Sequence, residues 1–494
     1  MAKPPDSSPT ILSIDAGTSA LKAALYQDDG RLLGLAVQRY EYRTPHPGWA
    51  EIDPETWWHA FIAALADLRR QGYNLRELRA LGVTGQMHAP ILLDENSNPV
   101  IPAILWLDQR AGAELRELQA RLQLPPHKLN ASFTLPKLLW LHRHQPQTLA
   151  RARILLWPKD YLRFRLTGSI ATDLTDAAGA SLLDWEQRTW AEAYATMVGL
   201  TPDILPPIRV ANADAGPIKP EIADKLGLSP RIRVIIGAGD VISLLGAAPM
   251  QSGRMVCIMG SSTMLATPIP SNFQADPQHR LYHYPFLPIP VLNGIQSTSG
   301  SALSWAWKTL YEPATSPEDA IAAALQTPPA AEGLIFLPFL AGERSPYWND
   351  ALRGGFYGLT LSHRRDHMLR SIMEGVAFSV RHLLDIAAEM QTPITELALA
   401  GGAAAMQGWA QIFADICQRP VYLYAGQSAV TRSIYALCRS ALSPAINFTE
   451  ALSAAISPPV AHFTPRNQLS SRYDQAYQQY LELARFVNAS LAAD

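Results

Sequence analysis

The feature that most constrains this chain lies near its midpoint, where residues 234–240 read Val-Ile-Ile-Gly-Ala-Gly-Asp. Three consecutive β-branched residues followed by Gly-x-Gly predict a buried strand whose exit turn lets the backbone approach a ligand closely. Ligands of α/β sheets bind where loops leave the carboxyl ends of strands, so Asp240 is a candidate functional carboxylate. Such a group can accept a proton from a substrate hydroxyl. The pattern fits equally well an aspartate that only caps a helix beginning at Val241.

The N-terminal stretch predicts an antiparallel meander. Residues 11–14 and 21–26 are apolar and are joined by a turn of small residues, and a second turn at 28–30 leads into residues 31–37. In the first turn, the backbone N–H groups and the hydroxyls of Thr18 and Ser19 could hold phosphate oxygens, and Asp15 could hold the water shell of Mg²⁺. A plain hairpin turn has the same pattern, and the G-x-x-x-x-G-K-[ST] loop is absent.

The second half opens with a similar arrangement. Residues 253–259 predict a strand, residues 260–263 (Gly-Ser-Ser-Thr) a turn and residues 264–266 another strand, although no clear sequence repeat accompanies the similarity. Further on, a strand ending at 398–400 runs into Gly401 and Gly402, where the backbone could lie flat against a purine. An ordinary Gly-Gly turn explains that pair as well.

Polar side chains follow two further apolar runs in the first half. One run leads into residues 85–88 (Gly-Gln-Met-His), and the other leads into residues 106–110 (Trp-Leu-Asp-Gln-Arg). A polyol needs hydrogen-bonding groups that converge from several loops beside an aromatic face, and His88, Asp108 and Arg110 suit that need. Alternatively, Asp108 caps a helix that begins at the next residue, and Arg110 forms a surface ion pair.

Length and composition narrow the class of protein. A chain of 494 residues exceeds one ordinary core and indicates two domains, or three. A formal net charge of −2 argues against a nucleic-acid partner. The three cysteines, Cys257, Cys417 and Cys438, are too widely spaced for a disulfide framework or a zinc site. Because we also find no signal peptide and no 18-residue apolar run, we expect a cytoplasmic protein without a membrane partner.

Taken together, the motifs resemble those of the FGGY carbohydrate kinases over roughly residues 11–424. Residues 15–19 (Asp-Ala-Gly-Thr-Ser) with Lys22 are similar to the family's first phosphate loop, and residues 132–144 and 354–374 fit its two signatures. The resemblance implies an α/β fold of two actin-like (ribonuclease H-like) ATPase domains around a central cleft. It implies a sugar-binding N-terminal domain at 11–245 and a nucleotide-binding C-terminal domain at 246–494, and the polar, proline-containing residues 1–10 predict a disordered tail before them.

Within the family the likeness is greatest to xylulokinases, with gluconokinases as the alternative. The xylulokinase-like segments are 48–54, 85–88, 105–110, 157–162 and 341–348. The resemblance implies that the γ-phosphoryl group of ATP passes to the 5-hydroxyl of D-xylulose, with Mg²⁺ required, and it suggests a homodimer that has sugar and ATP as its small-molecule partners.

The resemblance also assigns roles to individual residues. Asp240 is the expected catalytic base and, with Asp15, the expected metal ligand. The expected sugar contacts are Met87, His88, Trp106 and Asp108. The expected ATP contacts are Gly17, Thr18, Ser19, Lys22, Gly260, Ser261, Gly401, Gly402 and Ala403.

Four departures from the family pattern fall mainly on the nucleotide side. They are Thr263 in place of a glycine, Val241 in place of a polar residue after Asp240, an Ala-Ala-Ala stretch at 403–405 without the usual lysine, and Thr-Arg-Ser at 431–433 in place of a Gly-Ala-Ala helix. A threonine cannot freely adopt the positive φ that a glycine allows. These departures motivate a second hypothesis, a non-catalytic sugar-binding relative, which the retained Asp15, Thr18 and Asp240 oppose.

Overall fold

The computed structural model describes residues 10–402, 406–425 and 428–491. The chain forms two compact units, Met1–Gly246 with Ser428–Ile456, and Ala247–Gln427 with Ser457–Asp494. The predicted division differs, because it placed residues 428–456, and also Gly246, in the second domain. Of the predicted disordered tail at 1–10, only Thr10 lies within the described residues, and its N–H donates to the Tyr26 carbonyl at 3.0 Å. Among the described residues, no helix has both the length and the apolarity that crossing a bilayer requires.

A five-stranded sheet in the order β13-β5-β1-β2-β3 forms the centre of the first unit. The predicted meander is present as β1 (Ile11–Ala16), β2 (Ala20–Tyr26) and β3 (Leu32–Arg39), and both pairings, β1 with β2 and β2 with β3, are antiparallel. Both β5 (Ala80–Gly85) and β13 (Arg233–Val234) continue the sheet in parallel with β1. This mixed order agrees with the ribonuclease H-like expectation.

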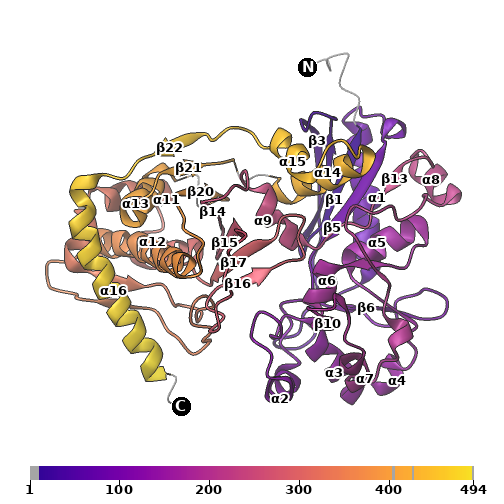
Figure 1. Cartoon of the computed structure of the whole chain (residues 1–494), viewed down its shortest axis with the longest axis horizontal. Coiled ribbons are helices and arrows are strands. Elements are labelled where there is room, and N and C mark those ends of the chain that lie inside the picture. The colour runs from indigo at the N-terminus through magenta and orange to yellow at the C-terminus, as the bar shows by residue number, and fades with distance from the viewer. Residues whose placement is uncertain (1–9, 403–405, 426–427, 492–494) are drawn as a thin grey trace. The chain divides into compact units, whose positions relative to one another are not determined.

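Helices cover both faces of this sheet (Figure 1). On one face lie α1 (Pro54–Arg70), whose N-cap Asp53 accepts a hydrogen bond from the Glu55 N–H, and α5 (Pro158–Thr167). On the other lie α14 (Ala429–Leu442) and α15 (Phe448–Ala455), which the chain contributes after passing through the second unit. The other elements of the first unit are β4 (Glu51–Ile52), β6 (Ile91–Leu93), β7 (Ala103–Ile104), α2 (Gly112–Leu122), α3 (Thr134–His144), α4 (Pro146–Leu149), β8 (Ile154–Leu156), β9 (Thr172–Asp173), α6 (Leu174–Gly179), β10 (Leu183–Asp184), β11 (Thr189–Trp190), α7 (Glu192–Met197), β12 (Ile208–Arg209), α8 (Pro220–Leu226) and α9 (Ser243–Gly246).

The second unit is organised around a seven-stranded sheet in the order β16-β17-β15-β14-β20-β21-β22. Its strands are β14 (Arg254–Met259), β15 (Thr263–Pro268), β16 (Tyr282–Tyr284), β17 (Val291–Gln296), β20 (Glu396–Ala400), β21 (Val421–Leu423) and β22 (Ala461–Phe463). The five central strands repeat the first sheet, because β14, β15 and β17 form an antiparallel meander and β20 and β21 run parallel to β14. The similarity of the two turns in the sequence therefore reflects a structural duplication. The other elements are α10 (Gly300–Leu310), α11 (Pro317–Gln326), β18 (Ile335–Leu337), β19 (Gly355–Tyr357), α12 (Arg365–Glu389), α13 (Gln407–Cys417) and α16 (Ser470–Leu491).

The strand that precedes Asp240 is shorter than the sequence predicts. After β13 the chain makes a single bridge at Ile235 and then turns at Gly237, whose φ is +80°. A Cβ at Gly237 would lie 2.0 Å from the Val83 carbonyl oxygen, so only glycine fits this turn. Asp240 is the first residue of a 3₁₀ turn, Asp240–Ile242, and Gly239 occupies the cap position. Asp240 is therefore not the N-cap of a helix that begins at Val241.

Candidate functional site

The turn after β1 is held in place through one carbonyl group. The oxygen of Gly17 accepts hydrogen bonds from the Tyr40 hydroxyl at 2.6 Å, the Trp57 indole at 3.3 Å and the Gln86 amide at 3.4 Å. These donors come from three separate parts of the chain, and no sequence pattern predicted that they converge. The turn is thereby fixed before any ligand binds, which lowers the entropy cost of binding.

Thr18, a predicted phosphate contact, is hydrogen-bonded to Trp106, a predicted sugar contact. The Trp106 indole donates to the Thr18 hydroxyl at 3.0 Å, and that hydroxyl donates to the Gln86 side-chain oxygen at 3.3 Å. The Trp106 side chain remains 40% exposed, so its ring is accessible to a ligand. Ser19 is exposed, and its carbonyl accepts a hydrogen bond from the Tyr40 N–H at 3.1 Å. Thr18 thus connects the phosphate turn to the aromatic residue.

Burial shifts the pKa of both Asp15 and Asp240, and the charge of Asp15 acts on Asp240. Burial raises the pKa of Asp15, and Lys22, whose Nζ lies 3.3 Å from Oδ2, partly offsets the effect. Burial first, and the charge of Asp15 second, raise the pKa of Asp240 to about 7, against the N–H groups of Asp240 and Val241. A carboxylate with a pKa near neutrality is suited to general-base catalysis.

This pair of carboxylates also fits a magnesium ion. Mg²⁺ is commonly held by one or two carboxylates together with substrate phosphates, and Asp15 and Asp240 supply hard oxygen donors. Among the described residues, no cluster of three or more His, Cys, Asp or Glu side chains could hold a metal by protein ligands alone. The donor set therefore matches an ion that arrives with a phosphate ligand.

Met87 and His88 lie next to the loop that carries Asp240. Met87 is buried, and a Cβ on Gly239 would lie only 2.6 Å from its Cγ, so the side chain packs directly on that backbone. The ring of His88 places Nδ1 2.7 Å from the Gly179 carbonyl, which can only accept, so Nδ1 carries the proton and Nε2 is an acceptor. Loss of water around the ring, followed by the charge of Lys137, lowers the pKa of His88 to about 3. The imidazole is therefore neutral at physiological pH.

Asp108 and Arg110 form a buried pair. Asp108 is fully buried and accepts hydrogen bonds from the Ala50 N–H at 2.6 Å and from the Arg110 guanidinium at 2.7 and 2.9 Å. Arg110 also bonds Glu51 at 2.8 Å and lies 3.6 Å from the centroid of the Trp49 ring. Because the pair is buried, the interpretation of Arg110 as part of a surface ion pair is wrong. Asp108 also does not cap a helix that begins at the next residue, because α2 begins at Gly112. In this structure Asp108 faces protein groups and fixes the loop that carries Trp106.

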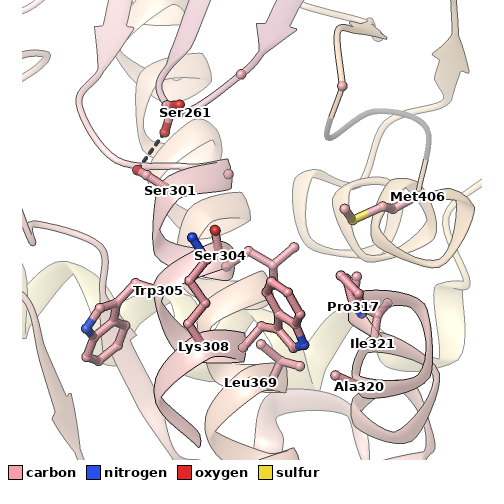
Figure 2. A pocket seen from close by; sticks show the side chains of 15 residues that line it. Ser261, Ser301, Ser304, Trp305, Lys308, Pro317, Ala320, Ile321, Leu369 and Met406 are labelled. Atoms are coloured by element: carbon pink, nitrogen blue, oxygen red, sulfur yellow. Dashed lines mark hydrogen bonds between the residues drawn. The ribbon is translucent and has the colours of Figure 1, made fainter. Parts of the chain in front are cut away.

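The second unit contains a cavity of about 620 Å³ beside its own small-residue turn (Figure 2). Of the predicted ATP contacts, Gly260, Ser261 and Gly402 line it. The turn is docked on the start of α10, because the Ser261 carbonyl accepts from the Ser301 hydroxyl at 2.8 Å and from the Ser301 N–H at 3.1 Å. Gly401, the neighbour of Gly402, has a φ of +96° and is not part of the cavity lining. Ala403, the remaining predicted contact in this segment, is not among the residues that the structure describes.

The lining of this cavity divides into an apolar and a polar part. The apolar residues come from α10, α11 and α12 and from the segment before α13; they are Leu303, Trp305, Trp307, Pro317, Ala320, Ile321, Leu369 and Met406. The polar groups are Ser261, Ser301, Ser304 and Lys308. This volume and composition suit a small ligand with a flat apolar part. The contribution of α10 was not predicted, although the small-residue stretch 297–301 (Ser-Thr-Ser-Gly-Ser) before a helix is a signal for it.

Two of the four departures from the family pattern have structural explanations. Thr263 is the first residue of β15 and has no positive φ, so the expected strain does not arise. Residues 431–433 lie in α14 of the first unit, where Thr431 bonds the Tyr26 hydroxyl at 2.9 Å, Arg432 donates to the Gly246 carbonyl at 2.7 Å and Ser433 donates to the Ile242 carbonyl at 3.0 Å. These residues fasten α14 to β2 and to the turn that Asp240 begins.

Comparisons with known proteins agree with this architecture. The models of the N-terminal and C-terminal domains of the FGGY family of carbohydrate kinases match residues 10–246 and 255–432. The xylulose kinase of Escherichia coli (strain K12) is 30% identical over 486 residues, which cover 96% of this chain and 99% of the relative.

Solved structures give the same result. The xylulose kinase from Rhodospirillum rubrum has a TM-score of 0.89 at 27% identity, with 97% of this chain and 99% of that chain covered. The gluconate kinase from Lactobacillus acidophilus also has a TM-score of 0.89 at 27% identity, with 98% and 99% covered. The predicted two-domain α/β fold is confirmed, and the chain belongs to the FGGY family of carbohydrate kinases.

Proposed function

We propose that this kinase transfers the γ-phosphoryl group of ATP to the 5-hydroxyl of D-xylulose. One observation carries the proposal: in the first unit, Asp240 has a pKa of about 7, interacts with Asp15, and follows a backbone segment against which Met87 packs. The xylulose kinases among the relatives point to the same sugar. A base, a sugar-contacting pair and a phosphate turn are the parts that phosphoryl transfer to an alcohol requires.

The residues of the first unit act by positioning the sugar. The Nε2 atom of His88 accepts a hydrogen bond from a sugar hydroxyl, and the exposed ring of Trp106 lies against the carbon skeleton. Asp240 accepts the proton of the hydroxyl that receives the phosphoryl group. Asp108 contributes indirectly, by holding the loop of Trp106 through its pair with Arg110.

For the nucleotide, each unit supplies its own set of groups. We assign phosphate contacts to the turn of Gly17, Thr18, Ser19 and Lys22 in the first unit, and to Gly260 and Ser261 in the second. The apolar part of the second unit's cavity takes the adenine, beside Gly402. Mg²⁺, held by Asp15 and Asp240 with the phosphates, would supply charge neutralisation for the transferred group.

Gluconate is the second candidate substrate. The favouring observation is the gluconate kinase from Lactobacillus acidophilus, whose TM-score of 0.89 equals that of the xylulose kinase from Rhodospirillum rubrum. A carboxylate on the substrate would need a cationic partner, and Arg110, the cation nearest Trp106 in sequence, is 2% exposed and already paired with two carboxylates. Arg110 is therefore not available to a substrate carboxylate, and Lys137, whose Nζ donates to the His88 carbonyl at 3.0 Å, is the cation nearest His88.

A coupled ADP-release assay tests the proposal. Purified protein with Mg-ATP is offered D-xylulose, D-ribulose, L-ribulose, gluconate and glycerol, and we expect turnover to be highest on D-xylulose. Asp240→Asn should reduce kcat by about 10² to 10⁴, as removal of a positioned base does. Asp224→Asn, an exposed carboxylate in α8 of the same unit, is the control and should leave kcat unchanged.

The outcomes separate the hypotheses. Highest turnover on gluconate would replace the substrate and keep the mechanism. Near-normal turnover of Asp240→Asn would contradict the assignment of the base. No turnover on any sugar, with sugar binding detected by calorimetry, would favour the non-catalytic hypothesis.

We further propose a cytoplasmic homodimer. The family resemblance suggests the dimer, and the three cysteines are buried and unpaired, as is usual in a reducing compartment. Light scattering coupled to size-exclusion chromatography should give twice the mass of the chain; a mass equal to one chain would contradict the dimer.

A further inference from the structure

The short helix α6 contacts the backbone on both sides of the proposed sugar site. At its start, the Thr175 hydroxyl oxygen accepts a hydrogen bond from the Gly239 N–H at 2.7 Å, one residue before Asp240. At its end, the Gly179 carbonyl accepts the Nδ1 proton of His88 at 2.7 Å. One helix of six residues therefore holds Gly239, the residue before the proposed base Asp240, and also determines the tautomer of His88.

Behind α6 lies a group of five buried charged side chains, which we call the Lys159 cluster: Lys159, Asp160, Arg163, Asp173 and Asp176. The Nζ atom of Lys159 lies 2.6 Å from Asp160, 3.0 Å from Asp173 and 3.1 Å from Asp176, and Arg163 lies 2.7 Å from Asp160. All five side chains are 0 to 2% exposed. Burying so many charges brings little stability, because the loss of hydration offsets the attraction. A function other than stability is a reasonable explanation for them.

The Lys159 cluster is connected to the loop before Asp240 at two points. Asp173 accepts the Thr175 hydroxyl proton at 2.6 Å, which leaves the lone pairs of that oxygen facing the Gly239 N–H. Arg163 donates to the Ile236 carbonyl at 2.9 Å. The loop is thus held at its beginning and at its end, and the direction of each hydrogen bond is fixed by a buried charge.

We propose that Thr175, held by the Lys159 cluster, is a positioning residue that aims the Asp240 carboxylate at the acceptor hydroxyl. The inference rests on the proposed function, since it needs Asp240 as the base. Without the Thr175 hydroxyl, the Gly239 N–H is buried without its acceptor, and the 237–240 loop is free to shift. A shift of about 1 Å in a catalytic group is enough to lower the rate on the order of 10²-fold.

Thr172, which is hydrogen-bonded to the Lys159 cluster without belonging to it, offers a matched control. Its hydroxyl donates to Asp160 at 2.7 Å and is fully buried, yet it makes no hydrogen bond to residues 236–240. Thr172→Val and Thr175→Val each remove one buried hydroxyl that donates to a carboxylate of the cluster. Only the second removes the acceptor of Gly239. A purely structural role predicts equal effects on kcat, and a positioning role predicts unequal ones.

The test measures kcat and both KM values for wild type, Thr172→Val, Thr175→Val and Thr175→Ser, with Asp240→Asn in parallel. We expect Thr175→Val to lower kcat by about ten- to a hundredfold, the range that an unsatisfied buried group produces, with KM for ATP unchanged. Thr175→Ser should restore kcat to within about threefold of wild type, and Thr172→Val should leave it within about threefold.

The kcat values of these variants distinguish failure of the positioning role from failure of the proposed mechanism. If Asp240→Asn is inactive while Thr175→Val turns over like wild type, or if Thr172→Val and Thr175→Val lose the same kcat, the positioning role is refuted and the proposed function stands. If Asp240→Asn retains turnover, Asp240 is not the base, and both the proposed mechanism and the positioning role that depends on it are refuted. Should Thr175→Val not fold, Thr175→Ser and Thr175→Ala, which differ only in the hydroxyl, give the same comparison: equal kcat values would refute the inference.

Discussion

A buried glutamate in the second unit gives a quantitative test of the structure. Glu343 is fully buried; its Oε1 accepts hydrogen bonds from the Ser297 N–H at 2.6 Å and the Arg344 N–H at 2.8 Å, whereas Oε2 has no hydrogen-bond partner among the described residues. Burial raises its pKa to about 7, against the effect of those two N–H groups. Glu343→Gln keeps the shape and the accepting oxygen, and removes the charge.

The expected effect on stability follows from the pKa. Because the folded protein binds the Glu343 proton more tightly than the unfolded chain does, the stabilisation is fully present below pH 4.5 and is lost as the pH rises to about 7. A rise in pKa from 4.5 to about 7 corresponds to ~3 kcal/mol, at about 1.4 kcal/mol for each factor of ten in proton affinity. Glu343→Gln has no titrating group at this position and does not lose stability in this way. The difference in the free energy of unfolding between Glu343→Gln and wild type should therefore shift in favour of the variant by ~3 kcal/mol between pH 4.5 and pH 8.

Differential scanning calorimetry at pH 5 and pH 8 measures this change. With roughly 2–4 °C of midpoint per kcal/mol for a domain of this size, the difference between Glu343→Gln and wild type should grow by several degrees towards pH 8. The control is Glu482→Gln, an exposed position on α16, whose difference from wild type should not depend on pH. The same midpoint difference for Glu343→Gln at both pH values would refute the buried, desolvated carboxylate.

Three further perturbations test the site. Gly179→Ala places a Cβ 2.8 Å from the His88 ring, so steady-state kinetics should show a KM for the sugar that is raised about tenfold or more with KM for ATP unchanged; an unchanged sugar KM would contradict the contact. Lys308→Met removes the exposed cation of the second unit's cavity and should raise KM for ATP several-fold without changing KM for the sugar; the reverse pattern would exclude the cavity as the nucleotide site. Arg110→Met leaves Asp108 buried without its partner and should lower the free energy of unfolding by ~3 kcal/mol in chemical denaturation, whereas a loss below about 1 kcal/mol would mean that the pair is solvated.

Much of the fold could be predicted because its signals are local. Apolar runs, small-residue turns and glycines located β1, β2, β5, β14 and β20 within a few residues, since side-chain periodicity and turn chemistry act between near neighbours. The same signals singled out Asp15, Thr18 and Asp240 as candidates, because each lies near the end of an apolar run, and their roles stay predictions. The predicted length of one strand was wrong. The β-branched run at 234–236 extends beyond the end of β13 at Val234, because Gly237 turns the backbone out of the sheet.

The environment of each site residue could not be predicted, because it depends on segments that folding brings together. Thr175 meets Gly239 across 64 residues, and Tyr40, Trp57 and Gln86 meet on one carbonyl from three parts of the chain. No local pattern encodes such contacts.

Some properties of this protein follow from its sequence, and others are decided only by its tertiary structure. The sequence determined the residue types, the duplicated strand–turn–strand plan and, through them, the family. The tertiary structure decided that Asp108 is a buried partner of Arg110, that helix α14 belongs to the first unit, and that His88 is neutral with its Nδ1 proton on Gly179. The reason is physical: backbone conformation is set mainly by neighbouring residues, whereas burial, charge and hydrogen-bond direction are sums over contacts that exist only after the chain has folded.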